Sequence, residues 1–89
     1  MTVYVDNANI MWKGKRRFHM VADTLDELHS FCVIHNINRC WFDNHPKHPH
    51  YDITEEQRKS ILSYVKIISS KELLLISKSL RPNSSENIL

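Results

Sequence analysis

Glycine is almost absent from this chain: Gly14 is the only one among 89 residues. Loops that wrap a phosphate with backbone N–H groups need several glycines at fixed spacing, as in the dinucleotide-binding and Walker motifs. A single glycine therefore excludes both classes of nucleotide-binding loop.

Cysteine is also scarce, with only Cys32 and Cys40 present. Both lie in apolar segments, and they form no CxxC pair. A disulfide scaffold or a zinc ribbon needs more cysteines at closer spacing. We interpret both as buried thiols in a reducing compartment.

Long hydrophobic runs are missing as well. The most apolar stretch, residues 67–80, contains serines and charged residues too often for a membrane span. The first five residues lack the basic segment of a secretion signal. These absences predict a cytoplasmic protein with no membrane partner.

The chain has only a small excess of positive over negative charge, with a formal net charge of +2. Four basic residues nevertheless fall within five positions: Lys13, Lys15, Arg16 and Arg17. A local basic patch suits a phosphate or another small anion better than a long nucleic-acid duplex. We therefore favour a small phosphate-bearing ligand over nucleic acid.

The length of the chain predicts one domain with one modest core. We expect this domain to span residues 1–81 and a solvated tail to occupy residues 82–89. Because so small a core leaves helix surface uncovered, we also expect a homo-oligomer.

Three helix starts share one signature, a Ser or Thr followed three residues later by Glu or Gln: Thr24, Thr54 and Ser69. This pattern is typical of a capping box, in which the two side chains satisfy backbone donors of the first turn. Apolar residues then recur at helical spacing. The sequence therefore predicts three helices, the last one running to Arg81.

Short stretches that favour β-structure precede these helices, over residues 2–5, 39–42 and 65–68. Strands that alternate with helices predict crossovers and a mostly parallel sheet. Within the long segment 7–22, residues 16–21 alternate well enough to add an extra edge strand. The predicted fold class is a small α/β domain with three helices and a mostly parallel sheet of three to four strands.

Polar residues follow the predicted strands. Ligands of open parallel sheets bind outside the carboxyl ends of the strands, which here are Asp6, Asp43 and Ser69. We therefore predict a binding site at this edge of the sheet. Its expected ligand-binding residues are Asp6, Trp12, Lys15, Arg17, His19, Asp23, His50, Tyr51 and Asp52.

Several of these residues also have structural interpretations. Asp6 can hold a metal or a basic group, or it can cap a turn. His19 can contact phosphate or transfer a proton near neutral pH, or it can be a strand residue bonded to a carboxylate. Asp23 fits an acid at a helix N-terminus. The rings of Trp12 and Tyr51 can stack on a base.

The stretch 44–52 is unusual because it combines two prolines with three histidines. Histidine and aspartate are ligands of transition metals, but their spacing here matches no zinc motif. We expect contact with an anion or a nucleotide and no cofactor. A divalent metal held by Asp6, His50 and Asp52 is the alternative.

Five short segments together resemble a family of small bacterial and tailed-phage proteins catalogued as domain of unknown function 4031. They are Val3-Tyr4-Val5-Asp6, His19-Met20-Val21-Ala22-Asp23-Thr24, Glu27-Leu28-His29, Trp41-Phe42 and His50-Tyr51-Asp52. The resemblance implies no activity, but it implies that His50 matters more than His45 or His48. Some members look fused to metal-dependent phosphohydrolases of the HD type, which points toward nucleotides.

The first strand is also similar to that of PIN-like nucleases, because Asp6 and Asn7 end it. Those enzymes need several acids around a divalent metal. The third predicted strand departs from that pattern, since it leads to Ser69 where an acid is needed.

Three hypotheses from different classes follow. In the first, the protein binds a small phosphate-bearing nucleotide or nucleotide-derived signal without turnover. If the gene belongs to a phage, the protein would be located in the host cytoplasm and would sequester an immune signal of the host. In the second, it is a metal-dependent nuclease or phosphohydrolase that uses Asp6, Asp23, His50 and Asp52. In the third, it is an inhibitor that binds another protein.

Overall fold

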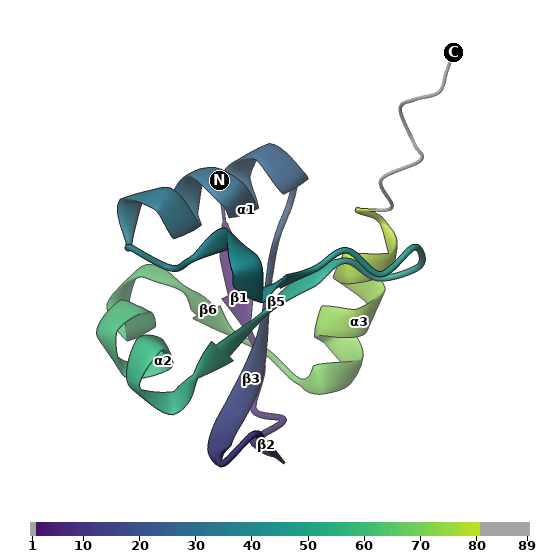
Figure 1. Ribbon diagram of the computed structural model, residues 1–89. Coiled ribbons are helices and arrows are strands. Elements are labelled where there is room, and N and C mark those ends of the chain that lie inside the picture. The colour runs from purple at the N-terminus through teal and green to yellow at the C-terminus, as the bar shows by residue number, and fades with distance from the viewer. Residues whose placement is uncertain (1, 81–89) are drawn as a thin grey trace.

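The computed structural model describes residues 2–80, except for the side chain of Trp12, and it has three layers (Figure 1). Two helices cover one face of a sheet and the third helix covers the other. The helices are α1 (Leu25–Ile34), α2 (Glu55–Ile61) and α3 (Ser70–Lys78), with 3-10 turns at Arg39–Trp41 and Leu62–Tyr64. The strands are β1 (Val3–Val5), β2 (Ile10–Trp12), β3 (Lys15–Ala22), β4 (Phe42–Asp43), β5 (His50–Thr54) and β6 (Lys66–Ile67).

The sheet of the described residues has six strands and is mixed and mostly antiparallel, so the prediction of a mostly parallel sheet of three to four strands is wrong in both respects. The strand order is β4-β5-β3-β1-β6, and β2 also pairs with β3. Among the described strands only β1 and β6 run parallel. No helix lies between β1 and β3, and the chain connects them through β2, so β3 returns beside β1 in the opposite direction.

The segment predicted as an edge strand is the centre of the sheet. β3 lies between β1 and β5. Alternate side chains of a strand point to opposite faces. Phe18, Met20 and Ala22 therefore pack in the core beneath α1 and α2, whereas Arg17 and His19 lie on the α3 side.

The second predicted strand, residues 39–42, is wrong for most of its length. The side chain of Asn38 accepts a hydrogen bond from the Cys40 N–H at 2.8 Å and caps a 3-10 turn. Only the two residues of β4 are then left to pair with β5. Cys40 is exposed on this turn, which corrects the prediction of a buried thiol, while Cys32 is buried as predicted.

All three predicted helix starts are confirmed. The side chains of Thr24, Thr54 and Ser69 each accept a hydrogen bond from the backbone N–H three residues later. At Thr54 and Ser69 the reciprocal bond completes a capping box. The last helix ends earlier than predicted, at Lys78, because the following N–H groups bond to carbonyls three residues before them and tighten the chain into a turn.

The core occupies both faces of the sheet. The larger cluster joins β1, β3 and β5 to α1 and α2, and the smaller one, Val21, Ile68, Leu73 and Leu80, lies beneath α3. Within residues 2–80 no helix is long and apolar enough to cross a membrane. The predicted tail, residues 82–89, lies outside the described residues.

Replacing Leu28 with alanine should lower the free energy of unfolding by about 2–5 kcal/mol, because the side chain is fully buried in the larger cluster. Val33, on the same helix, is 80% exposed and provides the control. We expect Val33→Ala to change stability by less than about 0.5 kcal/mol. Urea denaturation measures both, and equal effects would show that the buried face of α1 is wrongly assigned.

Candidate functional site

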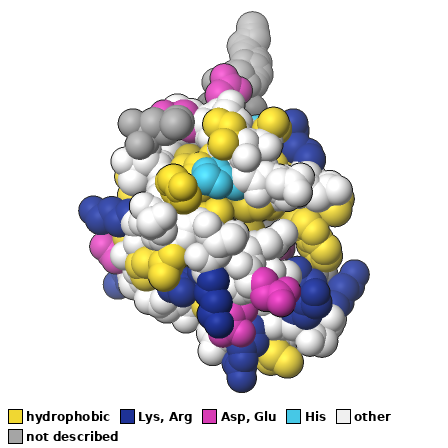
Figure 2. Space-filling view, turned by 90° about the vertical axis from the view of Figure 1, so that its left-hand side faces the viewer, with side chains coloured by type: hydrophobic (Ala, Val, Ile, Leu, Met, Phe, Trp, Pro, Cys, Tyr) yellow, Lys and Arg dark blue, Asp and Glu magenta, His cyan; other side chains and the backbone are white. Residues whose placement is uncertain are grey.

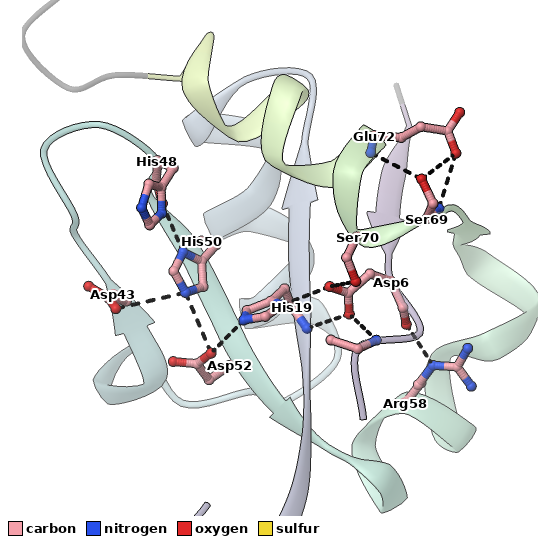
Figure 3. Close-up of polar contacts among 11 residues, drawn as sticks. Asp6, His19, Asp43, His48, His50, Asp52, Arg58, Ser69, Ser70 and Glu72 are labelled. Carbon is pink, nitrogen blue, oxygen red and sulfur yellow. Dashed lines mark hydrogen bonds and ion pairs between the residues drawn. The ribbon is translucent and has the colours of Figure 1, made fainter. Parts of the chain in front are cut away.

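Polar side chains from neighbouring strands meet on the α3 side of the sheet (Figure 3). Asp6 follows β1, His19 is on β3, and His50 and Asp52 are on β5. His19 and Asp52 are directly opposite in the β3–β5 register, so their side chains share one face. Asp43 joins them from β4, where it pairs with His50.

Asp6 is the most deeply buried residue of this group, and it is hydrogen-bonded to His19. Its carboxylate is fully buried, and Oδ1 accepts hydrogen bonds from the backbone N–H of His19 at 2.9 Å and of Ala8 at 3.2 Å. Oδ2 lies 2.7 Å from Nδ1 of His19 and 3.3 Å from Oγ of Ser70. Burial raises the pKa of Asp6, but the hydrogen bonds and the charge of His19 outweigh it and lower the pKa below its usual value. Asp6 is therefore an ionised acceptor.

Arg58 holds the loop after β1 in place. From α2, its Nε donates to the carbonyl of Asp6 at 3.3 Å, and its terminal nitrogen donates to Oδ1 of Asn7 at 2.6 Å. The guanidinium also lies 4.7 Å from the ring centroid of Phe18. Sequence reasoning missed Arg58, because nothing local to it shows that α2 packs beside the end of β1.

His19 connects Asp6 to the open part of the site. Since the carboxylate of Asp6 only accepts hydrogen bonds, Nδ1 of His19 carries the proton. The other ring nitrogen, Nε2, lies 3.9 Å from Oδ1 of Asp52. His19 therefore presents Nε2 to the strand-β5 side of the site.

His50 is held in the same way. Its Nδ1 donates to the carbonyl of His48 at 2.8 Å, and its Nε2 lies 3.5 Å from Oδ1 of Asp52 and 3.8 Å from Oδ2 of Asp43. Burial lowers the pKa of His50, but the hydrogen bonds and the nearby carboxylates raise it above its usual value. The rings of His19 and His50 meet edge to face with centroids 5.0 Å apart.

A pocket of about 280 Å³ opens over these groups, and its lining residues are Ile10, Arg17, His19, Asp43, His50 and Asp52. The guanidinium of Arg17 lies 4.4 Å from the ring centroid of Trp41. Arg17 is only 6% exposed and His50 only 8%, so both are more buried than expected for residues in loops at the edge of a sheet. They lie on adjacent antiparallel strands, not in loops after parallel strands.

Other predicted site residues lie elsewhere. Lys15, at the start of β3, lines a separate pocket with Glu55 and Glu56. Lys and Arg side chains gather toward the lower end of the face shown in Figure 2. Asp23 accepts a hydrogen bond from the Tyr4 hydroxyl at 2.9 Å and lines another pocket beside the start of α1. The basic run therefore does not converge on the histidines as a unit. The side chain of Trp12 lies outside the described part of the chain.

Tyr51 points away from the pocket, because side chains alternate along β5. It is fully buried, and its hydroxyl lies 2.8 Å from Nδ1 of His29. The expectation that its ring stacks on a ligand is thus corrected. His29 packs against Phe42 and Tyr51.

Within residues 2–80, one group of three has metal-ligand spacing: His19, His50 and Asp52, whose ligand atoms all lie within 4.8 Å of one another. Asp6, which belongs to the alternative metal set of Asp6, His50 and Asp52, lies on the other side of the His19 ring, because His19 bonds to Asp6 through one ring nitrogen and faces Asp52 with the other. The hydrogen bond between Asp6 and Nδ1 of His19 orients the ring of His19 within this group.

Comparison with known proteins gives one match. No curated protein and no solved structure matches the chain. The profile of the family described as "Protein of unknown function (DUF4031)" matches residues 3–79, a range that includes every residue of the site. This match confirms the resemblance carried by the short sequence segments, and the chain belongs to the DUF4031 family.

Proposed function

We propose that the protein binds a small phosphate-bearing nucleotide, or a signal derived from one, in the pocket above His19 and His50. The observation that supports this proposal is the mixture of groups in the pocket. One guanidinium and two imidazoles line it together with two carboxylates. These groups suit a ligand that carries both negative charge and hydrogen-bond donors.

The basic side chains of the pocket are the groups that we expect to bind the phosphate. The guanidinium of Arg17 can form charge-assisted hydrogen bonds with phosphate oxygens, and each imidazole can add one when its Nε2 carries a proton. The carboxylates of Asp43 and Asp52 repel a bare anion, but they accept hydrogen bonds from hydroxyl groups such as those of a ribose. We therefore expect a nucleotide to bind more tightly than inorganic phosphate.

Capture without turnover fits this arrangement better than nuclease activity. Of the four residues expected for a nuclease, Asp23 lines another pocket, and Asp6 is buried with both carboxylate oxygens in hydrogen bonds. If the gene belongs to a phage, capture of this kind would withdraw an immune signal from the host.

Large apolar side chains stay exposed on the helices, among them Val33, Ile34 and Leu75. A second copy of the chain packed on such surface would remove it from water. We therefore propose a homo-oligomer as the binding form. The pocket itself, at about 280 Å³, lies at the lower end of the range of about 300–1,000 Å³ that is usual for ligand pockets.

The test is calorimetric titration with ADP-ribose, a cyclic dinucleotide, AMP and inorganic phosphate. Arg17→Ala should weaken nucleotide affinity about ten- to a hundredfold, because each charge-assisted hydrogen bond contributes about 1.5–3 kcal/mol. Arg17→Lys keeps the charge but loses the planar fork, so it should also weaken binding. His50→Ala should have a smaller effect.

Lys15→Ala is the matched control, because Lys15 lies on the same strand but lines a different pocket. Its affinity should stay within about twofold of wild type. Circular dichroism checks that each variant is folded. If a nucleotide binds and the Arg17 and His50 variants bind it as tightly as wild type does, this pocket is not the site.

A further inference from the structure

We infer that the protein binds one divalent transition-metal ion through Nε2 of His19, Nε2 of His50 and the carboxylate of Asp52 (Figure 3). This inference goes beyond the proposed capture of a nucleotide and does not depend on it. It rests on the direction in which both rings are held and on the distances between the three ligand atoms.

Both imidazoles are fixed in the tautomer that a metal needs. Nδ1 of His19 donates to the carboxylate of Asp6 at 2.7 Å, and Nδ1 of His50 donates to the carbonyl of His48 at 2.8 Å. The proton of each neutral ring is thereby placed on Nδ1, so the lone pair is on Nε2. Histidines that bind metals are oriented by this kind of bond from the second ring nitrogen to a carboxylate or a carbonyl.

The two lone pairs converge on one carboxylate. Oδ1 of Asp52 lies 3.5 Å from Nε2 of His50 and 3.9 Å from Nε2 of His19. Bonds of about 2.0–2.2 Å to a tetrahedral ion place neighbouring ligand atoms about 3.4 Å apart. The His50–Asp52 distance already fits, and the other ligand pairs, within 4.8 Å, need only a modest side-chain movement.

The backbone supports a rigid site. His19 and Asp52 are paired across β3 and β5, and His50 is two residues before Asp52 on the same face. All three ligands therefore come from adjacent strands and not from a mobile loop. Sites built on regular elements hold ligand geometry more closely than sites on loops.

The ligand types indicate the class of metal. Two imidazoles and one carboxylate suit Zn²⁺, Fe²⁺, Co²⁺ or Ni²⁺, whereas Mg²⁺ and Ca²⁺ prefer oxygen ligands alone. Asp43, with a half-exposed side chain, lies 3.8 Å from Nε2 of His50 and can approach a fourth position. That position faces the pocket, so a phosphate oxygen could also occupy it.

A divalent ion would also offset the negative charge of the pocket. Asp43 and Asp52 both line it, and together they disfavour a phosphate. An ion bound between them and the two histidines would attract the phosphate instead. Metal binding and nucleotide binding should then be coupled, although each can be measured alone.

The experiment uses the purified full chain, freed of metal with a chelator and titrated with Zn²⁺ in the calorimeter and with Co²⁺ by visible absorption. We expect one ion per chain. His19→Ala, His50→Ala and Asp52→Asn should each weaken Zn²⁺ affinity by at least tenfold, because the first two remove a ligand nitrogen and the third replaces a charged carboxylate with a neutral amide. Asp6→Asn should weaken it about ten- to a hundredfold, because it removes the group that orients His19.

The control is the double variant His45→Ala/His48→Ala. These two rings stack on each other in the loop before β5, with centroids 3.7 Å apart, and neither supplies a ligand atom. The ring of His48 also stacks on that of His50, with centroids 5.7 Å apart, but the hydrogen bond that orients His50 comes from the backbone carbonyl of His48, which both alanines keep. Their removal should leave affinity within about twofold.

Three outcomes would overturn the inference. One is that the wild-type chain binds neither ion. Another is that the double variant loses the ion while His50→Ala retains it, which would place the metal on the loop. The last is that the ligand variants bind as tightly as wild type. Asp52→Asn is nearly isosteric and partly exposed, so it tests the site even if a histidine variant unfolds.

Discussion

Replacing Asp6 with alanine should lower the free energy of unfolding by about 3–5 kcal/mol. The carboxylate is fully buried and accepts hydrogen bonds from two backbone N–H groups, one imidazole and one hydroxyl. Alanine leaves these donors without an acceptor in a place that water does not reach. Typical domains are stable by only about 5–15 kcal/mol, so this one change removes a large share.

Asp6→Asn separates the backbone role of Asp6 from its role toward His19. The amide oxygen can still accept from the N–H groups of His19 and Ala8, but the amide nitrogen then faces Nδ1 of His19. We expect a smaller loss, about 1–3 kcal/mol. Urea denaturation of both variants gives the comparison. Equal stability of Asp6→Ala and wild type would show that the carboxylate does not organise the end of β1.

The helix starts were predictable because their signals are local. A capping residue and its partner three positions later decide where a helix begins. The sequence pattern identifies Thr24, Thr54 and Ser69, and these three residues are the N-caps in the structure. Residues buried on α1 were predictable for the same reason, since helical spacing fixes which side chains share a face.

The antiparallel pairing of the strands was not predictable from local signals of this kind. Lys13 and Gly14 both have positive φ angles, 50° and 75°, and together they form the tight turn between β2 and β3. Turns of this kind favour Asn-Gly or Asp-Gly, so Lys-Gly is a weak signal. That turn sends β3 back beside β2 and β1, so both pairs are antiparallel.

The sequence grouped several residues that do lie near one another, although for a different geometric reason. Asp6, His19, His50 and Asp52 do lie together, but adjacent antiparallel strands place them there and not the carboxyl ends of parallel strands. The alternation of His50 and Asp52 with buried residues marks β5 as a strand, and it would have shown which side chains share a face.

Replacing Tyr51 with alanine should cost about 3–5 kcal/mol in the free energy of unfolding, because a fully buried aromatic side chain is lost from the larger cluster. Tyr51→Phe keeps the ring and removes only the hydroxyl, which lies 2.8 Å from Nδ1 of His29. Its cost should be about 1–2 kcal/mol. Urea denaturation measures both.

The same pair of variants tests how β5 divides its residues between core and pocket. Tyr51 lies on the face opposite His50 and Asp52, so Tyr51→Phe should leave Zn²⁺ and nucleotide affinities within about twofold of wild type. Removing the hydroxyl then changes stability and not binding. A tenfold loss of nucleotide affinity with unchanged stability would mean the reverse, that the phenol contacts the ligand and that β5 presents its other face to the pocket.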